Sequence, residues 1–179
     1  MHFTAMQHAQ LFATKYTDDL SEGSVVIDFG AYSVNGNLRH LFEPHLKYIG
    51  IDQSEGPNVD IVCNNRSTPF EDNYASAIVS TSCFEHDDCF WMTFLEMCRI
   101  TKPGGYIYIN APSSGPYHGY PGDCWRFYKD SWKALEKWAN EHDHKVNLLE
   151  SYIDTRAEHV WMDSIGIFQK LPNQPSPAQ

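Results

Sequence analysis

The sequence has no apolar run that approaches the ~20 residues needed to span a bilayer, so we expect no membrane-spanning helix. Its first residues also lack the basic and then apolar pattern of a secretory signal. Basic residues are few, since 13 Lys and Arg stand against 23 Asp and Glu and give a net charge of −10. They are scattered singly. This excludes nucleic acid as the main partner, because phosphate backbones are bound by a basic stripe.

Cysteine is scarce and shows neither disulfide nor metal-ligand spacing. The five cysteines are odd in number, include no C-x-x-C pair and fall mostly within apolar segments: Cys63, Cys83, Cys89, Cys98 and Cys124. We interpret them as reduced, buried thiols of a cytoplasmic protein, and we expect no zinc or other metal site.

The composition that is present is typical of one globular domain. The chain has 179 residues, of which 42% are hydrophobic and 20% are charged. We expect a single domain over residues 1–171, which opens with an N-terminal helix within residues 1–21. A flexible tail is expected over residues 172–179.

Apolar segments alternate with helical patterns along the chain. Strands are expected at residues 25–29, 48–52, 59–63, 75–81, 106–110, 145–153 and 160–169. Helices are expected at 4–20, 37–44, 88–101 and 129–142, with a long irregular loop at 111–128. This order predicts an α/β fold, a Rossmann-like three-layer sandwich with a mostly parallel sheet of seven strands and helices between the first five.

The last two expected strands have no helix between them, so we expect an antiparallel final strand. In sheets of this kind, ligands bind outside the carboxyl ends of the parallel strands. The residues that end five of the strands should therefore face one common cleft: Phe29, Asp52, Cys63, Thr81 and Asn110.

The segment from Val25 to Gly36 carries the strongest functional signal. An apolar strand runs into a turn at Gly30, and the following strand ends in Asp52. A glycine lets the backbone approach a ligand, and an acid at that strand end can accept both ribose hydroxyls of a nucleoside. This pattern predicts an adenosyl cofactor, although Asp52 at a strand end could also simply cap a turn.

A nicotinamide dinucleotide is the obvious competing cofactor. Its fingerprint is G-x-G-x-x-G, and positions 30, 32 and 35 of this chain are Gly, Tyr and Asn. The two missing glycines are those that admit the pyrophosphate and pack the helix on the strand. The sequence therefore favours a cofactor without a pyrophosphate.

Five features in order resemble the class I S-adenosylmethionine-dependent methyltransferases, and within them the small type 11 group. They are Asp28-x-Gly30, Asp52, the pair Asn64-Asn65 before Pro69-Phe70, Phe84-Glu85-His86, and Lys102-Pro103-Gly104-Gly105. The likeness covers about residues 22–170. The family has a seven-stranded sheet with an antiparallel final strand, which agrees with the order of elements expected above.

The resemblance implies cofactor-binding roles for these positions. Gly30 would lie against the methionine portion of S-adenosylmethionine, and Asp28 beneath it would organise the loop. Asp52 would bind the ribose hydroxyls. Asn64 would bind the adenine edge, with help from the backbone of Asn65.

Two further positions are expected at the same site. Ser82 follows the fourth expected strand, and Tyr32 stands where relatives usually have a second glycine. A Tyr32 ring that turns inward would block the methionine tail. A ring that turns outward would leave a variant loop whose glycine reappears at Gly36.

The loop at 111–128 leaves the fifth expected strand over the position of the cofactor methyl group. Its aromatic and charged residues favour a substrate site formed by Tyr117, Trp125 and Arg126. In the alternative interpretation, Trp125 and Phe127 form the core of the loop, and Arg126 pairs with Asp123 for structural reasons.

An oxygen nucleophile must lose a proton, and histidine is suited to accept it. We expect His118 to be this base, with His86 as second choice and Asp123 as the residue that orients it or binds substrate. Glu85 and His86 could instead be a solvated pair that opens a helix.

Together these features predict a cytoplasmic S-adenosylmethionine-dependent methyltransferase. Its substrate would be a small, sugar-like molecule that is methylated in line on oxygen or nitrogen. The alternative is a catalytically idle relative that serves as a binding or partner subunit. The pocket would be completed by the N-terminal helix, by the 111–128 loop, or by a second copy of the chain in a homodimer.

Overall fold

The computed structural model describes residues 2–42, 44–156 and 160–172. Its strands are β1 (Val25–Phe29), β2 (Lys47–Asp52), β3 (Ile61–Val62), β4 (Ala75–Thr81), β5 (Thr101–Pro112), β6 (Val146–Ile153) and β7 (Asp163–Lys170). Its helices are α1 (Phe3–Tyr16), α2 (Phe90–Ile100) and α3 (Lys129–Glu141), with a short 3-10 turn, η1 (Arg39–Leu41).

The strands form one seven-stranded sheet in the order β3-β2-β1-β4-β5-β7-β6. Strands β1 to β5 pair in parallel, whereas β7 is antiparallel to both β5 and β6. The predicted α/β fold, with its mostly parallel sheet and antiparallel final strand, is therefore confirmed. The antiparallel β6–β7 pairing follows from the short connection between these strands, residues 154–162, because a parallel crossover needs a dozen or more residues.

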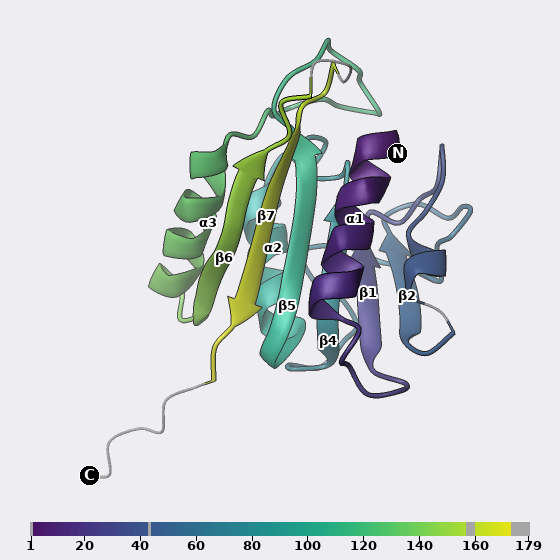
Figure 1. Cartoon of the computed structure of the whole chain (residues 1–179), viewed down its shortest axis with the longest axis vertical. Helices are drawn as coiled ribbons and strands as arrows, with labels where there is room; N and C mark the ends of the chain where they lie inside the picture. The colour runs from purple at the N-terminus through teal and green to yellow at the C-terminus, as the bar shows by residue number, and fades with distance from the viewer. Residues whose placement is uncertain (1, 43, 157–159, 173–179) are drawn as a thin grey trace.

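Helices cover both faces of the sheet, as Figure 1 shows. Helix α1 packs across one face together with η1, over buried residues such as Val26 and Tyr108. Helices α2 and α3 cover the other face, over alternate residues such as Ile27 and Ile107. Because neighbouring residues of a strand point to opposite faces, two apolar clusters enclose the sheet.

The connection from β1 to β2 differs from the prediction. No α-helix is present at 37–44 in its described residues, and only the short turn η1 forms there. Leu38 and Phe42 are both fully buried, so the segment packs tightly on the sheet, and Pro44 ends it. No helix connects β2 to β3 or β3 to β4 either. The expectation of helices between all of the first five strands was wrong.

Other boundaries also moved. The expected strand at 59–63 is reduced to Ile61–Val62, and β5 begins earlier than predicted, so that it includes the glycine pair at 104–105. The predicted tail falls almost wholly outside the described residues, which end at 172.

Within the described ranges, no helix is both long and apolar enough to cross a membrane. All five cysteines are free, but only Cys98 is buried, so the expectation of buried thiols was wrong for the other four: Cys63, Cys83 and Cys89 are partly buried, and Cys124 is exposed.

The carboxyl ends of the parallel strands meet at one edge of the sheet, at the top of Figure 1. The irregular segment between β5 and α3 lies beyond this edge in the same view. We call this edge the carboxyl edge. It is where the predicted cofactor and substrate residues come together.

Candidate active site

The turn that follows β1 fits closely against the turn that follows β4. Gly30 has a φ of +76°, and a Cβ placed on it would lie 2.4 Å from Sγ and 2.7 Å from Cβ of Cys83. The amides of Gly30 and Ala31 both donate to the carbonyl of Ile51, at 3.0 and 2.9 Å. Gly30 is therefore required by its φ and by the approach of Cys83.

We expect Gly30→Ala to lose at least about 2 kcal/mol more folding free energy than Gly23→Ala. Both glycines have a φ of +76°, but nothing lies within 4 Å of a Cβ on Gly23. The Gly23 variant thus carries only the backbone strain of a left-handed alanine, about 1 kcal/mol. Urea unfolding of the two variants measures the difference, and equal losses would show that Cys83 moves away freely.

Asp28 supports this turn from beneath through a chain of hydrogen bonds. The hydroxyl of Tyr48 donates to the Asp28 carboxylate. Nδ2 of Asn58 donates to the Tyr48 hydroxyl at 3.1 Å and to the carbonyl of Ala31 at 3.1 Å. These hydrogen bonds link the Asp28 carboxylate to the backbone of the turn at Ala31.

Burial raises the pKa of Asp28 to about 7, although the Tyr48 hydrogen bond partly opposes this shift. Because the pKa is higher in the folded than in the unfolded state, ionisation of Asp28 opposes folding. Its cost begins as the pH rises above the ordinary carboxyl pKa and is complete only above about 7.

We therefore expect Asp28→Asn to gain stability relative to the wild type as the pH rises. The gain from pH 5 to pH 8 should be about 2.6 kcal/mol, since the linkage acts over about two pH units of this range and one unit corresponds to about 1.4 kcal/mol. Thermal unfolding across this pH range measures it. Asp18→Asn, at an exposed position, is the control and should follow the wild type. A constant difference across the range would contradict the assigned shift.

Asp52 lies half-buried at the end of β2, and both of its oxygens accept backbone hydrogen bonds. Oδ2 accepts from the amide of Tyr32 at 3.2 Å, and Oδ1 accepts from the amide of Ser54 at 3.0 Å. The turn-capping role is therefore present. Each carboxylate oxygen has a second lone pair, so Asp52 keeps the capacity to accept ribose hydroxyls.

The ring of Tyr32 packs against the loop that follows β2. A Cβ on Gly56 would lie 2.1 Å from Cε2 of Tyr32, whereas the atoms nearest to a Cβ on Gly30 belong to Cys83. The ring thus lies over Gly56, on the ribose side of the predicted site, and not against Gly30.

The adenine-binding residues follow β3. Asn64 is exposed, and its Oδ1 accepts from the amide of Arg66 at 2.9 Å. Asn65 is buried, and its Oδ1 has no hydrogen-bond partner among the described residues. The side chain of Arg66 reaches Asp87 at 2.6 Å and ties this loop to the segment after β4.

Buried polar atoms without partners collect at the carboxyl edge. Six such side-chain atoms occur in the described parts of the chain, and four lie at or just after the ends of β3, β4 and β5: Asn65 Oδ1, Thr81 Oγ1, Glu85 Oε2 and Asn110 Oδ1. Ser82 links the ends of β4 and β5, because its amide donates to the carbonyl of Asn110 at 2.9 Å. Its backbone has a φ of +52°. Buried polar groups normally have partners, so this edge suits a polar ligand such as an adenosyl cofactor.

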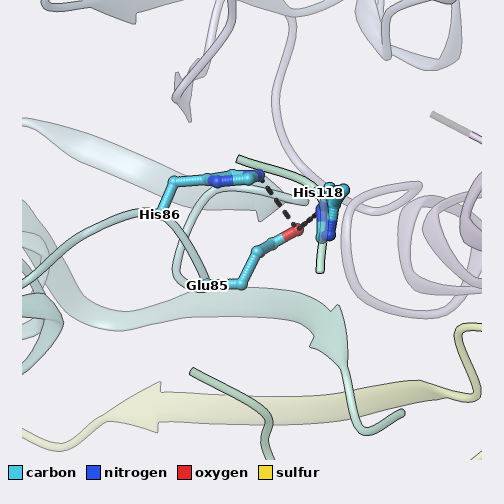
Figure 2. A group of neighbouring side chains, drawn as sticks. All are labelled: Glu85, His86 and His118. Carbon is cyan, nitrogen blue, oxygen red and sulfur yellow. Dashed lines mark ion pairs between the residues drawn. The ribbon is translucent and has the colours of Figure 1, made fainter. Parts of the chain in front are cut away.

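A carboxylate and two histidines meet beside the strand ends, as Figure 2 shows. Oε1 of Glu85 lies 3.7 Å from Nε2 of His86 and 4.0 Å from Nε2 of His118. The two rings are 5.0 Å apart. We call these three residues the Glu85–His86–His118 cluster.

Both histidines of the cluster are held from behind. Nδ1 of His118 lies 3.1 Å from Oδ2 of Asp123, and Nδ1 of His86 contacts the carbonyl of Gly122. Arg126 binds Asp123 at 2.7 Å, and these hydrogen bonds lower the pKa of Asp123. The structure thus brings together the three predicted catalytic residues, with Asp123 in the orienting position.

Glu85 is the site residue that the sequence interpretation missed. A solvated Glu85–His86 pair was one reading, but only 1% of the Glu85 side chain is exposed. Burial raises the pKa of Glu85 to about 8 and lowers the pKa of His86. The sequence signal for Glu85 is a charged pair directly after an apolar strand, which indicates a polar site at the end of that strand. Thr81 and Asn110 carry a similar signal, because they are polar residues at the ends of buried strands.

The three predicted substrate residues line one hollow of about 280 Å³, together with Asp123. Tyr117 is 77% exposed, while Trp125 is anchored by a hydrogen bond from Nε1 to the carbonyl of Asp87 at 3.0 Å. Arg126 is engaged with Asp123 and with the carbonyl of Pro116 at 3.0 Å, so part of its capacity is structural. Phe127 is buried and packs the loop.

A larger hollow, of about 810 Å³, lies between α1 and the end of β6 and is lined by residues such as Leu11 and Tyr152. It includes none of the predicted site residues. We therefore assign the chemistry to the carboxyl edge and not to this larger hollow.

Comparison with known proteins agrees with this geometry. Residues 27–109 match the model of the type 11 family described as "Methyltransferase domain". This segment runs from β1 into β5. No curated protein matches the chain.

Solved structures share the fold at low sequence identity. The Burkholderia thailandensis 1,6-didemethyltoxoflavin-N1-methyltransferase, solved with 1,6-didemethyltoxoflavin and S-adenosylhomocysteine, has a TM-score of 0.71 and 16% identity over 94% of this chain and 79% of its own. The complex between the Haloferax volcanii Trm112 methyltransferase activator and a protein assigned as a methyltransferase gives 0.69 and 15%, over 98% and 92%. The [4+2]-cyclase SpnF gives 0.68 and 15%, over 93% and 82%. These likenesses show the fold, which carries more than one chemistry.

Proposed function

We propose that the chain is a class I methyltransferase that uses S-adenosylmethionine to methylate a small, polar, sugar-like molecule on oxygen or nitrogen, a proposal that its fold and the family model matching residues 27–109 support. One observation carries this proposal. The carboxyl edge joins a nucleoside-type half, from Gly30 to Asn65, to the Glu85–His86–His118 cluster.

The residues of the nucleoside-type half fit the cofactor. The backbone at Gly30 would lie against its methionine portion, Asp52 would bind the ribose, and Asn64 and Asn65 the adenine. Ser82 would line the same site. Bound S-adenosylmethionine supplies a methyl group that its sulfonium has already activated. The protein must therefore align the acceptor, exclude water and receive a proton, and alignment alone contributes ~7–11 kcal/mol.

The other half of the site would bind the acceptor. Tyr117 and Trp125 line the hollow of about 280 Å³ and offer aromatic surfaces on which a sugar face can stack. The acceptor's proton leaves at the Glu85–His86–His118 cluster, where Asp123 orients His118.

One observation favours a second candidate, a catalytically idle relative that acts as a binding or partner subunit. Both oxygens of Asp52 already accept backbone hydrogen bonds, and Tyr32 covers Gly56 beside them, which leaves less room for a ribose.

We also propose a cytoplasmic location, which the five free thiols support. A second copy that covers the exposed Tyr117 and Tyr120 would complete the acceptor pocket in a homodimer.

The test is transfer of a radiolabelled methyl group from S-adenosylmethionine to a panel of sugars, amino sugars and nitrogen heterocycles. We expect label on a polar acceptor, together with one equivalent of S-adenosylhomocysteine. Cofactor binding without label on any acceptor would instead support the idle relative.

A further inference from the structure

We propose that Glu85, His86 and His118 bind a divalent first-row transition metal ion such as Zn²⁺ or Co²⁺. The three ligand atoms lie within 4.8 Å of one another. The ion's binding is independent of the proposed function, whereas its chemical role rests on it.

The distances favour a shared ion over direct hydrogen bonds. Oε1 of Glu85 lies 3.7 and 4.0 Å from the two Nε2 atoms, which is too long for a hydrogen bond to either ring. An ion bound at roughly 2.0–2.2 Å by nitrogen and oxygen holds its ligands about 3–3.5 Å apart. The two Glu85–histidine separations would have to shorten by up to about half an ångström, and the two Nε2 atoms would have to approach each other from within 4.8 Å, to complete the site. Figure 2 shows both rings turned toward the same carboxylate oxygen.

A second observation concerns the far oxygen of Glu85. Its side chain is only 1% exposed, and Oε2 has no hydrogen-bond partner in the part of the chain that the structure describes. A buried carboxylate oxygen without a partner is costly, and a cation bound to the carboxylate reduces that cost.

The outer contacts of both histidines complete the arrangement. Nδ1 of His118 faces the carboxylate of Asp123 at 3.1 Å, and Nδ1 of His86 faces the carbonyl of Gly122. The carbonyl that faces Nδ1 of His86 keeps the proton there and leaves Nε2 free to bind a metal, which is the usual outer arrangement of histidine ligands. Asp123 holds His118 as an ion-pair partner beside Nδ1 and through a hydrogen bond from the His118 backbone amide.

A second group of possible ligands, formed by His8, Asp154 and Asp163, lacks these features. Asp154 already binds His8 at 2.9 Å and is paired with Arg156. Asp163 accepts from Thr4 at 2.5 Å and from His2 at 2.9 Å. Its carboxylates are thus satisfied within the protein, and we assign no ion there.

The cluster is closed on the Glu85 side and open on the side of the histidines. The side chains of His86 and His118 are 18% and 32% exposed, and the acceptor hollow lies next to Asp123. Three protein ligands leave a position for an acceptor hydroxyl, as in catalytic zinc sites. The ion would orient that hydroxyl and lower its pKa, so that the proton leaves to water.

The test is a titration of chelator-treated protein with Co²⁺, followed by visible absorption and calorimetry without S-adenosylmethionine. We expect one equivalent to bind, and Glu85→Gln and His118→Ala each to weaken binding by at least ~100-fold. Asp123→Asn, which weakens the outer contact to His118 and also the pairing with Arg126, should weaken it ~10–100-fold. Cys124→Ser and His45→Ala should bind like the wild type, since neither side chain belongs to the cluster.

Loss of Co²⁺ binding in Cys124→Ser, or unchanged binding in Glu85→Gln, would overturn the proposal. Titration of each variant with S-adenosylhomocysteine shows whether it is folded and tests the proposed function separately. A protein that binds S-adenosylhomocysteine but no Co²⁺ contradicts only the metal site. A protein that binds Co²⁺ but no S-adenosylhomocysteine contradicts only the cofactor assignment.

Discussion

Asp52→Ala is expected to lower the affinity for S-adenosylhomocysteine by at least about 100-fold. A carboxylate that accepts two ribose hydroxyls makes two charged hydrogen bonds, each worth roughly 1.5–3 kcal/mol. Since 1.4 kcal/mol corresponds to a factor of ten, their loss reaches two orders of magnitude. The variant also frees the amides of Tyr32 and Ser54, which loosens the loops on either side. Calorimetric titration measures the affinity.

The control is Asp18→Ala, an exposed acid that follows α1. It changes the net charge by the same amount and should bind like the wild type. If Asp52→Ala also kept wild-type affinity, Asp52 would serve only to cap the turn after β2, and the ribose would have to lie elsewhere.

His118→Ala is expected to reduce turnover by about 100-fold or more and to leave S-adenosylhomocysteine affinity within about threefold of the wild type. Proton removal by a positioned group contributes roughly 10²–10⁴ to rate. His118 belongs to the cluster where the acceptor proton leaves, whether its Nε2 acts on that proton directly or through a bound ion. In the described parts of the chain, none of its hydrogen bonds, ion pairs or ring contacts involves a residue assigned to the nucleoside-type half.

The readout is the initial rate of methyl transfer at saturating S-adenosylmethionine, with the affinity measured in parallel. His45→Ala removes an exposed histidine near the start of β2, at the opposite edge of the sheet, and should retain full turnover. Unchanged turnover in His118→Ala would remove the cluster from the catalytic account.

The sheet was predictable because its strands are strongly apolar and regularly spaced. All seven residues of β4 are buried, and a run of that kind signals a central parallel strand. The first crossover was not predictable in the same way. Leu38 and Phe42 are placed at helical spacing, but they are buried in a short turn that ends at Pro44, because tertiary packing overrides a short local pattern.

The candidate site shows the same division. The order of the motifs predicted that Gly30 and Asp52 lie at neighbouring strand ends. Hydrogen bonds join these two strand ends in the structure, from the amide of Gly30 to the carbonyl of Ile51 and from the amide of Tyr32 to Asp52. The meeting of Glu85 with His118 could not be read from the sequence, because 33 positions separate them and an irregular loop brings them together. Cysteine spacing addressed only thiolate metal sites and gave no information about this cluster.

The most direct test of the account is calorimetric titration of the unmodified chain with S-adenosylhomocysteine, with NAD titrated in parallel. We expect saturable binding of S-adenosylhomocysteine at one site per chain and no signal with NAD, since positions 32 and 35 are Tyr and Asn and not the glycines that a pyrophosphate needs. Absence of S-adenosylhomocysteine binding would contradict it. That result would mean that Tyr32 and the occupied oxygens of Asp52 close the pocket, and that the chain does not act through this cofactor.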